Sequence, residues 1–266
     1  MKTEELDNLS TTTLIDMMDM FLINTRLERN PHYQPDSPWE IKIYEFAITN
    51  AFGSWPEENQ RNFIWKLFDF TLQVEGTNLY LGMYNLLLDS PRFKQFGYKS
   101  ATVQLELFNL NQSVIISSST CFERLMHLLH YADTQTELKT SETFSNFKKY
   151  LREKDALDPF VYFVFFLREI REYIRKFRTA ELHTGSKLKK RILVLDEFTD
   201  ELSNDLLDLH NIMISIWRPL VDVLNGIRPG YMGGVRRSDT DWLQHFHLGN
   251  RLELELRKSE IIESLK

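Results

Sequence analysis

The sequence contains little of what interrupts helices or crosses membranes. Its 266 residues include only ten glycines and eight prolines, the two residue types that most often break helices. A membrane-spanning helix needs roughly 20 apolar residues, whereas the longest apolar run here, from Phe160 to Leu167, ends at Arg168. We therefore expect a helix-rich protein that makes no contact with a membrane.

Cysteine is almost absent, which limits the disulfide chemistry open to the chain. The single cysteine, Cys121, excludes an internal disulfide, and its apolar helical surroundings predict a core position. The first five residues are polar and acidic, and they lack the apolar segment of a secretory signal. These features favour a reducing compartment, and we expect a cytoplasmic protein.

The charge balance excludes a chain-wide attraction to nucleic acid. Acidic residues outnumber Lys and Arg by 38 to 32, which gives a net charge of -6 and an isoelectric point near 5.7. A site for RNA or another polyanion must therefore be a local basic patch on an acidic body. The apolar fraction of 42% is sufficient for a sizeable core.

Helical spacing begins near the N-terminus. Ser10 or Thr11 is a suitable cap for a first helix that ends before Pro31, and Ser37-Pro38 marks a second start. The first helix is predicted to bury one face, made of Leu14, Met17, Met18, Phe21 and Leu22.

A third helix is predicted to start at Ser54-Trp55-Pro56. Its apolar residues are Phe63, Leu67, Phe70 and Leu72. Gly76 is predicted to interrupt it, so that residues 79–88 form a separate, shorter and buried helix.

Helical periodicity also dominates the rest of the chain. A long helix is predicted from Ala101 to about Tyr131 and includes the β-branched run Val114-Ile115-Ile116. Asp158-Pro159 starts an aromatic helix, Thr199 caps another, and a last helix begins near Ser238. The fold class predicted is all-α, a multi-helix bundle, with an N-terminal helical region (1–96) and a C-terminal helical bundle (97–266) packed as one globular unit.

One segment reverses the charge of the chain. Residues 168–191 contain nine Lys and Arg against three Glu, an excess of six. Arg168, Arg171, Arg175 and Arg178 follow each other at three- and four-residue spacings and so share one helical face. Aligned arginines can bind phosphate oxygens, and the predicted nucleic-acid contacts are Arg171, Arg175, Lys187, Lys189, Lys190 and Arg191. The alternative is a solvated face, partly paired with nearby acids.

Arg178 and His183 stand within this segment in an R-x4-H pattern. From Ala101 onward, the helix pattern and this motif resemble the HEPN superfamily, helical domains that include many ribonucleases. The resemblance implies metal-independent RNA cleavage at the cleft of a homodimer, with His183 as general acid or base and Arg178 stabilising charge on the phosphate. Two R-x5-H pairs, Arg26/His32 and Arg124/His130, also occur. Arg178/His183 is preferred because it follows a predicted helix, lies in the basic segment and includes the polar Thr179 and the acidic Glu181.

Three functions therefore stay open. The first is a HEPN-like ribonuclease or other phosphodiester-acting protein. The second is a non-catalytic helical interaction or scaffold protein, and the third, a minor one, is a helical binder of haem or a small ligand. Neither a metal-binding motif nor a cofactor motif is present, so we expect no metal site and no cofactor.

Overall fold

The computed structural model describes residues 9–29, 54–155, 158–161, 217–224 and 258–260, together with residues 6, 163, 209, 262 and 263. All regular structure in these residues is helical, which confirms the predicted all-α class. The elements are the α-helices α2 (Thr11–Arg29), α4 (Glu57–Asp89), α5 (Pro91–Phe96), α6 (Ala101–Thr134), α7 (Thr143–Glu153) and α11 (Trp217–Leu224), with the 3-10 turns η2 (Gly97–Lys99) and η3 (Thr140–Glu142).

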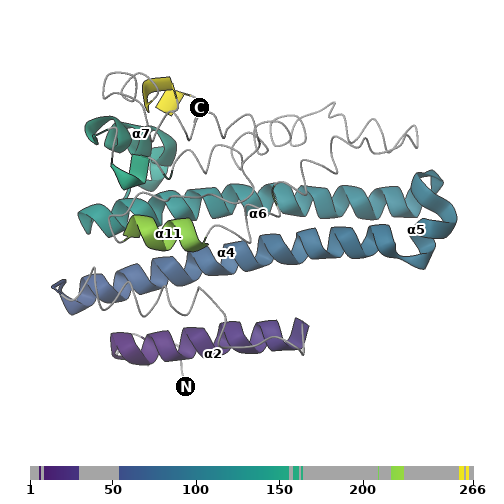
Figure 1. Ribbon diagram of the computed structural model, residues 1–266, viewed down its shortest axis with the longest axis horizontal. Coiled ribbons are helices and arrows are strands. Elements are labelled where there is room, and N and C mark those ends of the chain that lie inside the picture. The colour runs from purple at the N-terminus through teal and green to yellow at the C-terminus, as the bar shows by residue number, and fades with distance from the viewer. Residues whose placement is uncertain are drawn as a thin grey trace.

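A hairpin of two long helices forms the centre of the molecule. Helices α4 and α6 contain 33 and 34 residues and lie side by side in opposite directions, joined at one end by α5 (Figure 1). Two serines start the later helices, because Ser90 Oγ accepts the amide of Phe93 and Ser100 Oγ accepts that of Val103. These caps allow the chain to reverse within a short connection.

The core lies between the facing sides of α4 and α6. Fully buried side chains on α4 pack against a longer series on α6. They include Phe63, Leu67, Phe70 and Val74 on α4, and Leu107, Val114, Cys121, Leu125 and Leu128 on α6. The predicted long helix after Ala101 and the core position of Cys121 are both confirmed, and Val114-Ile115-Ile116 is helical as predicted. Burial raises the pKa of the Cys121 thiol, which keeps it protonated.

The predicted break at Gly76 is wrong, because α4 runs through it without interruption. Glycine disfavours a helix by about 1 kcal/mol, a small cost beside the packing of α4 along its whole length on α6. Gly76 lies against α6, where a Cβ would be 3.6 Å from Ser117 Oγ. Next to it, the hydroxyls of Thr77 and Ser117 are 2.7 Å apart and join the two helices at mid-length.

Helix α2 packs on α4 and buries less than its sequence predicts. Ser10 caps it as expected, with its hydroxyl accepting the amide of Thr13. Its buried residues are Leu14, Ile15, Met18 and Leu22. The prediction that Met17 and Phe21 belong to the buried face is wrong, since they are 38% and 50% exposed.

Helix α7 and residues near the C-terminus close the open end of the hairpin. The Lys258 ammonium donates to the main-chain carbonyls of Arg152 and Lys154, where α7 ends, and Arg152 pairs with Glu263 at 2.5 Å. A cation at these carbonyls complements the helix dipole. The predicted start at Asp158 is confirmed, because its carboxylate accepts the amide of Phe160 at 2.8 Å.

The region around the predicted boundary at residues 96 and 97 forms the tip of the hairpin. Helix α5 and turn η2 connect α4 to α6 there. The core described above includes residues from both sides of this position. The division into regions 1–96 and 97–266 remains a prediction.

Two leucines on α6 offer a matched test of the core. Leu107 is fully buried and Leu105 is 52% exposed, two residues away on the same helix. We expect Leu107→Ala to lower the free energy of unfolding by roughly 2–5 kcal/mol, because the truncation leaves a cavity. The control Leu105→Ala should change it by less than about 0.5 kcal/mol. Urea denaturation measures both, and equal losses would contradict the assigned orientation of α6.

Candidate functional site

The predicted catalytic pair and basic patch lie outside the described residues. These are Arg178 and His183, and the predicted nucleic-acid contacts Arg171, Arg175, Lys187, Lys189, Lys190 and Arg191. The described residues instead contain a pocket, a polar seam between two helices and an exposed apolar stripe, none of which the sequence analysis predicted.

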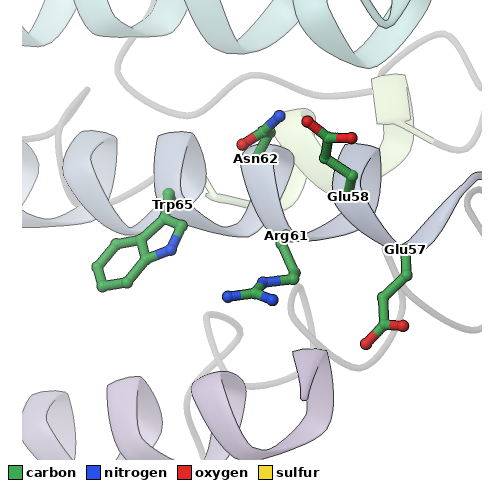
Figure 2. A pocket seen from close by; sticks show the side chains of 5 residues that line it. All are labelled: Glu57, Glu58, Arg61, Asn62 and Trp65. Carbon is green, nitrogen blue, oxygen red and sulfur yellow. The ribbon is translucent and has the colours of Figure 1, made fainter. Parts of the chain in front are cut away.

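The pocket lies at the N-terminal end of α4 and has a volume of about 370 Å³. Figure 2 shows its described lining, which is Glu57, Glu58, Arg61, Asn62 and Trp65. All five residues come from the first turns of α4, in two sets spaced by four residues that lie on two neighbouring sides of the helix. Glu58 and Asn62 point to one side of the helix, and Glu57, Arg61 and Trp65 point toward α2 (Figure 2).

The pocket is lined by charged side chains and one aromatic side chain. Arg61 is half-buried and donates to the main-chain oxygen of Leu6 at 3.4 Å, which fixes the segment before α2. The carboxylates of Glu57 and Glu58 stand in the first turn, where they stabilise the helix dipole. Glu58 points to the other side of α4 from Trp65, and the Arg61 guanidinium lies between Trp65 and Glu57 (Figure 2). The described lining therefore carries charges of both signs.

A seam of polar pairs follows one edge of the α4–α6 hairpin. Asp69 accepts from Arg124 at 2.9 Å, Lys66 pairs with Glu137 at 2.7 Å, and the Asn59 amide donates to Gln135 at 2.8 Å. These pairs fix the register of the two helices near the open end. Arg124 belongs to one of the R-x5-H pairs set aside above, and its contact with Asp69 gives it a structural role.

His127 lies in the same seam. Burial lowers the pKa of its imidazole below the ordinary 6.5, and the positive charges of Lys66 and Arg124 lower it further. His127 is therefore neutral at pH 7. His130, the histidine of the Arg124/His130 pair, packs its ring against Tyr150 with centroids 5.0 Å apart, and its Nδ1 lies 3.1 Å from the Thr136 main-chain oxygen.

A second group of charges surrounds Lys154 where α7 meets α6. Its ammonium lies 2.7 Å from Asp133 and 3.4 Å from Asp158, and it stands over the rings of Tyr150 and Phe160. Burial raises the pKa of the Tyr150 phenol, and the Asp133 carboxylate raises it further. With its charge balanced by two carboxylates, Lys154 holds α6, α7 and residue 158 together.

An apolar stripe lies exposed along α4, and we call it the α4 stripe. Its members are 36% to 72% exposed, and they are Trp65, Leu72, Leu79, Met83 and Leu86. The predicted burial of Leu72 and of the segment 79–88 is therefore wrong at these positions. Trp65, Leu72, Leu79 and Leu86 are spaced by seven residues, the repeat of a helix surface that packs on another helix.

The residues that the structure describes contain neither a metal-binding cluster nor a membrane-spanning helix. No group of three or more His, Cys, Asp or Glu there is placed to hold a metal ion. Within the same residues, no helix combines the length and the apolarity that crossing a membrane requires. Comparisons of the chain with protein-family models, with curated proteins and with solved structures found no match.

His127 provides a test of the polar seam. Because its folded pKa lies below the unfolded value of 6.5, the unfolded chain binds a proton first as the pH falls. Stability should therefore fall as the pH is lowered from 6.5 through the folded pKa of His127. In His127→Gln, the part of this decrease in stability that comes from His127 should disappear. Urea denaturation at several pH values measures the free energy of unfolding of both proteins.

A proton NMR titration distinguishes the two causes of the low His127 pKa, which are burial and the nearby positive charges. The His127 resonance is the one that vanishes in His127→Gln. Its midpoint should lie below that of a freely exposed histidine and move up in Lys66→Gln, which removes a positive charge. A midpoint at 6.5 in the wild type, unmoved in Lys66→Gln, would contradict the arrangement described.

Proposed function

We propose that the protein cleaves RNA, or acts on another phosphodiester, without a metal ion, through Arg178 and His183. One observation carries the proposal: the two residues stand five positions apart within residues 168–191, where nine Lys and Arg occur with three Glu on a chain of net charge -6. The all-α fold is compatible with it, since the HEPN resemblance implies a helical domain.

The chemistry requires one base and one cation. Neutral His183 takes the proton of the ribose 2′-hydroxyl, whose oxygen then forms a bond to phosphorus. The bond from phosphorus to the 5′-oxygen breaks, and that oxygen leaves with a proton from His183 or water. Arg178 stabilises the charge that develops on the phosphate oxygens. The products are a 2′,3′-cyclic phosphate and a 5′-hydroxyl.

The remaining basic residues bind the substrate in this proposal. Lys and Arg near the pair neutralise backbone phosphates, so binding weakens as salt concentration rises. RNA is the expected partner, and the resemblance implies a homodimer with a shared cleft. Both are parts of the proposal that need their own measurements.

A second function is favoured by a different observation. The α4 stripe exposes five large apolar side chains on one helix, and such continuous exposed surfaces mark sites of protein interaction. We propose as the alternative a non-catalytic interaction or scaffold protein. The two functions are separable, because the first depends on Arg178 and His183 and the second does not.

Cleavage of a labelled single-stranded RNA in the presence of EDTA tests the first function. We expect wild-type protein to yield the cyclic phosphate, and both His183→Ala and Arg178→Ala to lower the rate by roughly 100-fold or more. Arg124→Ala serves as the control, because Arg124 is engaged with Asp69 in the polar seam. Wild-type protein that leaves the RNA intact, or cleavage that persists in both variants, would refute the proposal.

A further inference from the structure

We draw no further inference here: the strongest candidate, the α4 stripe of exposed apolar side chains between Trp65 and Leu86, carries nothing beyond the alternative function proposed above, because no residue that the structure describes shows what covers it.

Discussion

The structure depends on the packing of α4 against α6. Two helices of 33 and 34 residues are each about 50 Å long, and an isolated helix in water is only marginally stable. Their apolar sides bury one another, from Phe63 at the open end to Val103 near the tip. Helix α2 then packs on α4 and α7 on α6, so the positions of both follow from this first contact.

The hairpin also explains why polar pairs lie near its open end and exposed leucines lie near its tip. Helix α6 covers one side of α4, and α2 covers part of another side. Near the open end, pairs such as Asp69 with Arg124 occupy the rim and fix the register. Toward the tip α4 extends beyond α2, and the side chains of Leu79 and Leu86 remain at the surface. The exposure of these two leucines is therefore a consequence of unequal helix lengths.

Sequence periodicity and capping residues were sufficient for much of the fold. Ser10 and Asp158 start helices as expected, and the helix after Ala101 ends within three residues of its predicted end. Periodicity orients a side chain about its own helix axis, but it does not say how much of that side a neighbouring helix covers. For that reason it placed Leu72 and Phe21 in the core, although they are 37% and 50% exposed. It did not predict the pocket at Trp65 either. The break expected at Gly76 failed because a local preference was outweighed by a long tertiary contact.

The three Arg/His pairs show what spacing alone leaves undecided. Arg124 and His130 have nearly the spacing of Arg178 and His183, yet Asp69 balances the charge of Arg124, and His130 packs on Tyr150. An arginine already paired with a carboxylate attracts a phosphate weakly. The segment around Arg178 has an excess of six positive charges, so its cations outnumber the acids within the segment itself. In the proposed function, this local excess of positive charge is what attracts a polyanion to an otherwise acidic chain.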